Sequence, residues 1–350
     1  MKPRLLVISG TFLATSGGAE ISALSLLKRL RRDWDIDVLS CNFRGRHLEV
    51  IQDGIRISAV PYAEFEAKAA RAIDEIRPRL IYTLMLGSDV AMRLGAEKGI
   101  PTIVNVCKVP VGPVYFKNHP PTQVFAVSTF VSDYLRTQHQ IHATVVNPIV
   151  EFESLLLPAS PRFITIFNPV KAKGGLLFRE LAQRMPRHEF AWVPGWDILR
   201  AEDGRFDPVV CAAICRSIGI RFSGGTPDEI ALQLPNVHQL RPAFPPHPIF
   251  QQTRILIVPS QWDEAFGRVA AEGMLFGVPV LAADVGGLAE LGRTGGSCLP
   301  KGNVAAWEAE IRKLDDPHYY SEVCARGRAW RERWLSRDHD DVCALFRTFR

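Results

Sequence analysis

The sequence predicts an α/β protein with two domains, each built around a parallel β-sheet. Short apolar runs typical of buried strands alternate with helical segments along the chain. The alternation breaks at residues 151–162, which contain three helix- and strand-breaking residues, and then restarts. A length of 350 residues also suits two domains better than one core. We expect domains at 1–150 and 163–334, a linker at 151–162, and a ligand-binding cleft between the domains.

The composition excludes several classes of function. Hydrophobic residues make up 47% and charged residues 23%, as in a soluble globular protein. The net charge of +5 suits anionic ligands, but the sequence has neither a stripe of basic residues nor a nucleic-acid-binding motif that would support nucleic acid as a partner. No stretch approaches the ~20 apolar residues of a membrane span. The basic, apolar start of the chain imitates a signal peptide, but Ser9 and Gly10 interrupt it, which favours strand, loop and helix.

The cysteines indicate a reducing compartment. They are seven in number and scattered, so we expect free thiols and a cytoplasmic protein. Cys211 and Cys215 are spaced i, i+4 on an expected helix, but no further ligand flanks them. Two small core residues are therefore favoured over a zinc site, which needs four ligands.

The expected elements follow in chain order. In the first domain, strands are expected at Leu5–Ser9, Ile36–Leu39, Ile55–Val60, Leu80–Thr83, Thr102–Val106, Val124–Val127 and Ala143–Val146. Its helices are expected at 21–31, 63–76, 88–97 and 129–138, and residues 108–121 form a loop. In the second domain, strands are expected at 163–167, 190–193, 237–240, 255–258 and 278–282. Its helices are expected at 174–184, 208–217 and 305–314, after Phe266 and Gly287, and at 318–335, with a last helix near 338–350.

The segment from Arg254 to Glu290 carries the strongest sign of a site. It predicts strand, acidic loop, helix, strand and helix, and its polar residues follow the carboxyl ends of strands, where such sheets bind ligands. A helix starting near Phe266 would place Glu264 just before its N-terminus and Glu272 about two turns inside. Free N–H groups there suit a phosphate, and the carboxylates suit sugar or ribose hydroxyls. The alternative makes Glu264 a helix cap and Glu272 a surface residue.

Two glycine-rich turns are further candidates. Gly17 and Gly18 follow a strand and open a helix, a geometry that lets backbone approach a pyrophosphate. Their spacing does not match a nicotinamide-binding fingerprint. Lys173 precedes Gly174 at the end of the second domain's first strand, where a lysine can neutralise a diphosphate leaving group. Its alternative is a solvated surface lysine. His119, in the long loop, is a candidate base or a solvated side chain.

Together these residues resemble the signature of the family 4 glycosyltransferases (glycosyltransferase group 1), which are retaining enzymes of the GT-B fold. The resemblance rests on five short stretches: Pro259-Ser260, the E-x₇-E pair Glu264 and Glu272 with Ala265-Phe266-Gly267, Gly277-Val278-Pro279-Val280, Gly286-Gly287-Leu288-Ala289-Glu290, and Asn168 through Gly174. Gly17-Gly18-Ala19-Glu20 resembles the family's N-terminal loop. The resemblance implies two Rossmann-like, doubly wound domains facing across a cleft, with the helix at 335–350 returning to the N-terminal, acceptor-side domain.

The resemblance also implies roles at the donor site. Glu272 would hold the nucleotide ribose and Glu264 the donor sugar, with Glu264 and Lys173 as the catalytic candidates. Backbone of Ala265, Phe266, Gly267 and Arg268 would meet sugar and phosphates. Gly17, Gly18, Asn168 and Lys173 would hold the diphosphate, with no metal or other cofactor. The family often has arginine in place of Asn168, a charge that Arg268 or Arg241 could replace, and histidine in place of Cys107, which Lys108 follows.

The implied function is sugar transfer from a nucleotide-diphosphate sugar to an acceptor hydroxyl, on a glycan, a lipid-linked molecule or a small molecule. The alternatives are another GT-B enzyme, a phosphorylase or epimerase, and a non-catalytic sugar-nucleotide or glycan-binding protein. Arginines between Arg326 and Arg337 beside Trp330 and Trp334 suit either peripheral contact with an anionic membrane or packing on the first domain. Packing is favoured.

Overall fold

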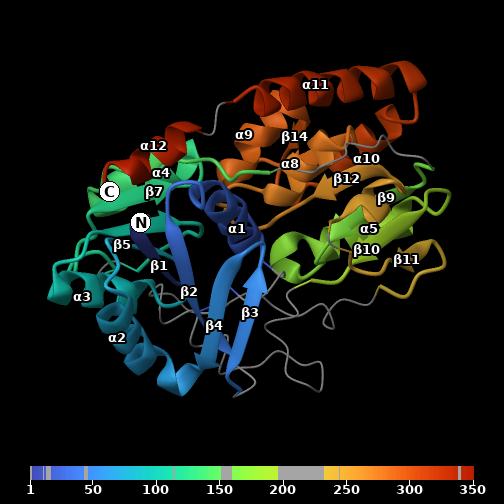
Figure 1. The fold of residues 1–350 in the computed structure, drawn as a ribbon. Coiled ribbons are helices and arrows are strands. Elements are labelled where there is room, and N and C mark those ends of the chain that lie inside the picture. The colour runs from blue at the N-terminus through green and yellow to red at the C-terminus, as the bar shows by residue number, and fades with distance from the viewer. Residues whose placement is uncertain are drawn as a thin grey trace. The chain divides into compact units, whose positions relative to one another are not determined.

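The chain folds into two α/β units. This computed structural model describes residues 2–10, 12, 17–42, 46–112, 115–150, 160–195, 232–243, 245–337 and 340–350. The described part of the first unit lies in Met1–Ile149 and Asp338–Arg350, and that of the second in Val150–Asp197 and Ser223–Arg337 (Figure 1). Each unit has its own sheet.

The first unit contains an eight-stranded sheet in the order β3-β4-β2-β1-β5-β6-β7-β8. Every pairing is parallel except that of β3 with β4, which is antiparallel. The strands are β1 (Arg4–Ile8), β2 (Asp35–Asn42), β3 (Leu48–Gln52), β4 (Ile55–Pro61), β5 (Leu80–Leu84), β6 (Thr102–Val106), β7 (Gln123–Ala126) and β8 (Thr144–Val145). The helices are α1 (Gly18–Leu30), α2 (Phe65–Ile76) after the short η1 (Tyr62–Glu64), α3 (Ser88–Lys98) and α4 (Thr129–His139). The sequence predicted each of these strands except β3, an edge strand.

Alternation along β1 divides the first core into two layers. Successive strand residues point to opposite faces of a sheet. Leu5 and Val7 therefore pack with the buried side chains of α1, and Leu6 and Ile8 with those of α2 and α3. All four side chains are at most 1% exposed, so both faces of this strand are covered. A parallel sheet buried on both faces reads as continuous apolar runs, which is why its central strands could be predicted.

The C-terminal helix α12 (Asp340–Arg347) completes the layer that contains α1. Phe346 is fully buried, and its ring centroid lies 5.6 Å from that of Tyr82 and 5.9 Å from that of Phe125. Arg347 Nε donates to Asp33 Oδ2 at 2.8 Å, and Arg32 pairs with Asp340 at 2.7 Å. The last helix is thus part of the first unit's core.

The second unit contains a six-stranded, wholly parallel sheet in the order β11-β10-β9-β12-β13-β14. The strands are β9 (Phe163–Phe167), β10 (Phe190–Val193), β11 (Val237–Gln239), β12 (Thr253–Val258), β13 (Val280–Ala283) and β14 (Ser297–Leu299). Taken in chain order this is 3-2-1-4-5-6, the order of a Rossmann-like doubly wound sheet. The strand order reverses between β9 and β12, and ligands bind such sheets at the carboxyl ends of the strands at that point.

Helices accompany this sheet along the chain (Figure 1). They are α5 (Gly175–Arg184), α7 (His247–Phe250), α8 (Arg268–Leu275), α9 (Gly286–Gly295), α10 (Val304–Lys313) and α11 (Pro317–Leu335). Neither the one-turn helix α7 nor the short strand β14 was predicted. The helix predicted at 208–217, with Cys211 and Cys215, and most of the predicted linker lie outside the described residues.

The aromatic face of α11 packs within the second unit, so the expectation that it packs on the first domain is wrong. Trp330 and Trp334 are 5% and 3% exposed, and their rings stack at 4.8 Å. A Cβ on Gly295 of α9 would lie 2.8 Å from Trp330 Cβ, so glycine allows this close approach of the two helices. Among the described residues, no helix combines the length and apolar character needed to cross a membrane.

Candidate active site

Two loops meet at the switch point of the second sheet. One follows β9 and contains the short helix η2 (Lys171–Lys173), and the other follows β12. Gly174 has φ +86°, and a Cβ there would lie 2.1 Å from the Pro259 carbonyl oxygen. The Gln261 N–H also donates to the Ala172 carbonyl at 2.8 Å. Because backbone touches backbone, residues of the two loops are held at short range.

Lys173 and Glu264 form an ion pair across these loops. Lys173 Nζ donates to Glu264 Oε1 at 2.5 Å, and Ser260 Oγ donates to the same oxygen at 2.6 Å. The side chains of Lys173 and Glu264 are 22% and 12% exposed, so the surface alternative for the lysine is wrong. The N-cap of the helix that follows is Gly267, so the helix-cap alternative for the glutamate is also wrong. Burial alone would raise the pKa of Glu264, but the Lys173 ammonium and hydrogen bonds from Lys173 and Ser260 outweigh it and lower that pKa.

The lowered pKa of Glu264 predicts a pH-dependent stability. A carboxyl whose pKa is lower in the folded state stabilises the fold above its unfolded-state pKa, near 4.5. That stabilisation is lost as the pH falls through the lower folded-state pKa. We expect the free energy of unfolding of wild type to exceed that of Glu264→Gln at neutral pH, and the difference to shrink below about pH 4. Urea unfolding of both proteins across this range measures it, and a pH-independent difference would contradict it.

The helix after the acidic loop begins later than predicted. Gly267 adopts φ 90° and ψ 49°, a left-handed conformation that excludes it from the helix, so α8 starts at Arg268. Glu272 is therefore about one turn inside α8, not two. A Cβ on Gly267 would lie 2.7 Å from Leu288 Cδ1, and the Gly287 N–H donates to the Glu264 carbonyl at 2.7 Å. The start of α9 thus packs directly on the acidic loop and fixes its path.

Glu272 is buried rather than on the surface. It is 8% exposed, and Arg268 Nε donates to its Oε1 at 2.7 Å. Burial raises the pKa of Glu272, and the charge of Arg268 opposes that rise without cancelling it. Arg268 is paired with Glu272, and its replacement of the arginine expected near Asn168 stays a prediction. The surface alternative for Glu272 is wrong.

The other predicted donor-side residues contribute backbone or lie close by. Ala265 and Phe266 are 8% and 6% exposed, and the Phe266 ring packs 5.7 Å from that of Trp334. Their side chains face the core, which leaves the backbone for a ligand. Asn168 directly follows β9 with φ +52° and is 7% exposed, and neither of its side-chain amide atoms has a hydrogen-bond partner among the described residues. An unpaired buried amide is costly, so a polar ligand group there would stabilise it.

The remaining predicted site residues belong to the first unit. Gly17 is the N-cap of α1 and Gly18 its first residue. A Cβ on Gly17 would lie 2.0 Å from the carboxylate of Glu20, which is 7% exposed. Burial raises the pKa of the Cys107 thiol, and Glu20 raises it further, so the thiol stays protonated and is unsuited to act as a base.

Sequence reasoning missed two residues of these clusters. Ser260 was noted only as part of a motif, and Glu20 only as part of a resemblance. Ser260 lies just after β12 and Glu20 at the start of α1, but the sequence does not show what either side chain contacts. Ser260 contacts Glu264 within a folded loop, and Glu20 acts on Cys107 of a distant segment. His119 is a partly exposed loop residue, and Lys108 lies directly after Cys107. The described residues contain no group of three or more His, Cys, Asp or Glu side chains that could hold a metal ion.

The segment that contains the acidic loop matches a known protein family. Residues 235–326 match the family model described as glycosyl transferases group 1. This part of the chain is similar to the group 1 glycosyl transferases. It holds Ser260, Glu264, Arg268 and Glu272, while Lys173 reaches it from the loop after β9.

Curated relatives match the chain over a limited length. Glycogen synthase of Mycobacterium tuberculosis is 41% identical over 88 residues, which is 24% of this chain. The matched segment spans about a fifth of the length of that relative (20%). The likeness to these relatives therefore covers about a quarter of this chain (24%).

Solved structures resemble the whole chain in fold. Sucrose-phosphate synthase from Thermosynechococcus elongatus has a TM-score of 0.73 at 18% identity, covering 99% of this chain and 98% of that one. The Anabaena protein HepE, in complex with UDP and glucose, has a TM-score of 0.70 at 16% identity, covering 95% of each chain. The catalytic domain of starch synthase IV from Arabidopsis thaliana, bound to ADP and acarbose, has a TM-score of 0.67 at 12% identity, covering 100% and 99%. The predicted GT-B fold is confirmed.

Proposed function

We propose that the chain is a retaining, metal-independent glycosyltransferase that moves a sugar from a nucleotide-diphosphate sugar to an acceptor hydroxyl. One observation carries the proposal: Lys173 and Glu264 are paired at the switch point of a Rossmann-like sheet, and Glu264 lies in the segment that is similar to the group 1 glycosyl transferases. A cation and a carboxylate at that edge suit a diphosphate and the hydroxyls of the sugar attached to it. The UDP and ADP named with the structural relatives fit the same kind of donor.

In this proposal, different residues bind the diphosphate, the sugar and the ribose of the donor. Lys173 would share its ammonium between Glu264 and the diphosphate, and would neutralise the leaving group as the glycosidic bond breaks. Glu264 would orient the sugar hydroxyls, and Glu272 Oε2, which has no hydrogen-bond partner among the described residues, would accept from the ribose. The leaving diphosphate would take the acceptor proton on the same face, so that no protein base is required. The high pKa of the Cys107 thiol is consistent with that absence.

The direct test has two stages. Thermal-shift measurements against UDP-, ADP-, GDP- and dTDP-sugars identify the donor, because a ligand that binds the folded state raises its melting temperature. The stabilising donor is then incubated with an acceptor panel, and sugar transfer is measured with the configuration of the new bond. Binding without transfer to any acceptor would favour a non-catalytic sugar-nucleotide-binding protein. Free sugar phosphate or an epimerised donor would favour a phosphorylase or epimerase.

Changing Glu272 tests the ribose contact. Glutamine keeps the shape of the side chain and an oxygen for Arg268 but removes the charge. We expect Glu272→Gln to weaken nucleotide binding by about tenfold, since a hydrogen bond to a charged group contributes about 1.5–3 kcal/mol. Calorimetric titration with the free nucleotide measures the affinity. The control is Glu322→Gln on the exposed face of α11, which should bind as wild type does. Equal affinities in all three proteins would contradict the assignment.

A further inference from the structure

The second unit contains a pocket at the amino ends of its strands, whereas Lys173 and Glu264 lie at the carboxyl ends. The pocket has a volume of about 700 Å³ and is lined by Arg162, Ile164, residues 185–189, Arg254, Arg312 and Asp315. Arg162 directly precedes β9, Arg254 is the second residue of β12, and residues 185–189 lead into β10. The lining therefore comes from the amino ends of the strands. At about 3.3 Å per residue, a strand's length of roughly 15–20 Å separates it from the switch-point loops.

We propose that this pocket is a second ligand site and that it binds a small phosphate-bearing molecule. Its volume lies in the range of about 300–1,000 Å³ that is usual for small-molecule sites. Four arginines line it (Arg162, Arg187, Arg254 and Arg312) against two carboxylates, Glu189 and Asp315. Arg162 pairs with Glu189 and Arg254 with Asp315, which leaves Arg187 and Arg312 as the excess cations of the wall. Guanidinium groups bind phosphate oxygens with two parallel hydrogen bonds, so an excess of arginine favours a phosphate.

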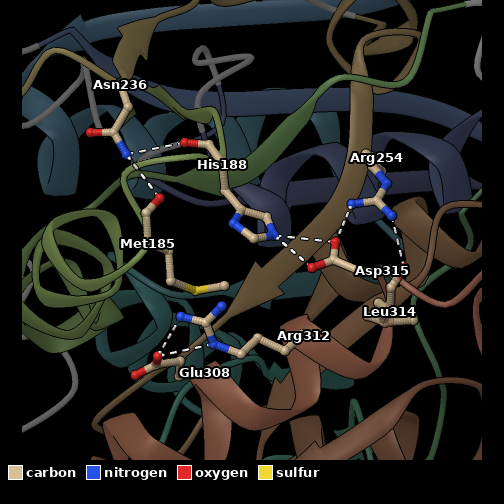
Figure 2. Close-up of polar contacts among 8 residues, drawn as sticks. All are labelled: Met185, His188, Asn236, Arg254, Glu308, Arg312, Leu314 and Asp315. Atoms are coloured by element: carbon tan, nitrogen blue, oxygen red, sulfur yellow. Dashed lines mark hydrogen bonds and ion pairs between the residues drawn. The ribbon is translucent and has the colours of Figure 1, made fainter.

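The cationic wall is held in place from several elements (Figure 2). Asp315 Oδ1 accepts from Arg254 Nη1 at 3.0 Å, and Asp315 Oδ2 lies 3.0 Å from His188 Nε2. Arg254 Nη2 also donates to the Leu314 carbonyl at 2.8 Å. Burial alone would raise the pKa of Asp315, but hydrogen bonds from Arg254 and His188 and their charges outweigh it and lower that pKa. Asp315 is thus an ionised anchor that joins the end of α10 to β12 and to the loop before β10.

The loop that carries Arg187 is also fixed. Asn236 Nδ2 donates to the backbone carbonyls of Ala182, Met185 and His188 at 3.0, 3.3 and 3.1 Å, as Figure 2 shows for the last two. One amide therefore holds both ends of the turn around Arg187. Because this loop is already ordered, the binding of a ligand by Arg187 costs little backbone conformational entropy.

Arg312 and Arg187 differ in whether they already form an ion pair. Arg312 donates to Glu308, which does not line the pocket, and the side chain of Arg312 is 53% exposed (Figure 2). Arg187 is exposed and makes no hydrogen bond or ion pair with any residue in the described part of the chain. Beside them, Ile164, Met185 and Pro186 form an apolar part of the wall. Arg187 and Arg312 therefore suit the phosphate, and the apolar part suits a carbon frame attached to it.

Calorimetric titration of the full chain tests the proposal with three probes: inorganic phosphate, a hexose 6-phosphate and the corresponding free hexose. Each probe is titrated into wild type, Lys173→Met, Arg187→Gln and Arg326→Gln. The first variant removes the cation of the proposed donor site. Arg326 is an exposed arginine of α11 outside the pocket, so its replacement matches the charge change of Arg187→Gln. Arg187 is exposed and unpaired, so its replacement leaves the fold intact.

We expect the hexose phosphate to bind wild type, Lys173→Met and Arg326→Gln alike, and Arg187→Gln about tenfold more weakly. Inorganic phosphate should bind at the same place with lower affinity, and free hexose should not bind. Binding lost in Lys173→Met and kept in Arg187→Gln would assign the phosphate to the donor site and overturn the proposal. Absence of binding in wild type would also overturn it. Either result is read without a transfer assay, so the proposal stands or falls independently of the proposed function.

Discussion

Replacing Glu264 by glutamine is expected to reduce sugar transfer by about a hundredfold to a thousandfold, the effect of removing one preorganised electrostatic group from an active site. Glu264 accepts from both Lys173 and Ser260, so the carboxylate holds the lysine, and in the proposed function it would also orient the sugar. Glutamine retains the size of the side chain but loses the charge that positions the ammonium. The measurement is the rate of transfer at saturating donor, together with donor affinity by calorimetry.

The control for Glu264→Gln is Glu322→Gln, whose carboxylate is 53% exposed and pairs with His318 on α11. It should transfer sugar as wild type does. Lys173→Met should lose activity to a similar extent, and the double variant should lose little more than either single one, because paired groups act as a unit. Losses that multiply in the double variant would show that the two residues act independently. Full activity of Glu264→Gln would reject its catalytic role.

Gly174→Ala is expected to destabilise the second unit by about 3–5 kcal/mol and to abolish donor binding. Alanine is strained at φ +86°, and its Cβ would lie 2.1 Å from the Pro259 carbonyl oxygen, so one of the two loops must move. Since Lys173 is on one loop and Glu264 on the other, movement of either separates the pair. Thermal unfolding followed by circular dichroism measures the stability, and calorimetry measures the donor affinity.

Gly99→Ala is the matched control for Gly174→Ala. Gly99 has φ +64°, but nothing lies within 4 Å of its Cβ position. Gly99→Ala therefore introduces backbone strain of about 1–2 kcal/mol without a steric clash. We expect Gly99→Ala to bind donor normally. If the two variants lose the same stability and both bind donor, the contact with Pro259 does not hold the site.

The central strands could be predicted because their burial leaves a plain sequence signal. The predicted bounds Thr102–Val106 match β6, and those at 163–167 and 190–193 match β9 and β10. The edge strand β3 was missed because it has no buried residue, and Ile51 on it is 76% exposed. A strand that contributes little to a core carries little periodicity.

The site could be predicted in its parts but not in its pairings. Glu264 and Lys173 were each selected, yet they are 91 positions apart, and only the order of β9 and β12 brings them together. The depth of Glu272 was misjudged because the conformation of Gly267, which depends on Leu288 of the next helix, sets the start of α8. The pocket at Arg187 had no sequence signal, since its lining is drawn from four separate segments.

The docking of α12 has a consequence for the autonomy of each unit. Among the described residues, the second unit lies between two parts of the first: residues up to Ile149 precede it, and residues from Asp340 follow it. A fragment that stops at Ile149 would lose Phe346 and expose the faces of Tyr82 and Phe125 to water. Residues 150–337, by contrast, keep every strand of their sheet and the aromatic face of α11. The two halves are therefore unequal as folding modules, and the C-terminal residues belong to the half that is synthesised first.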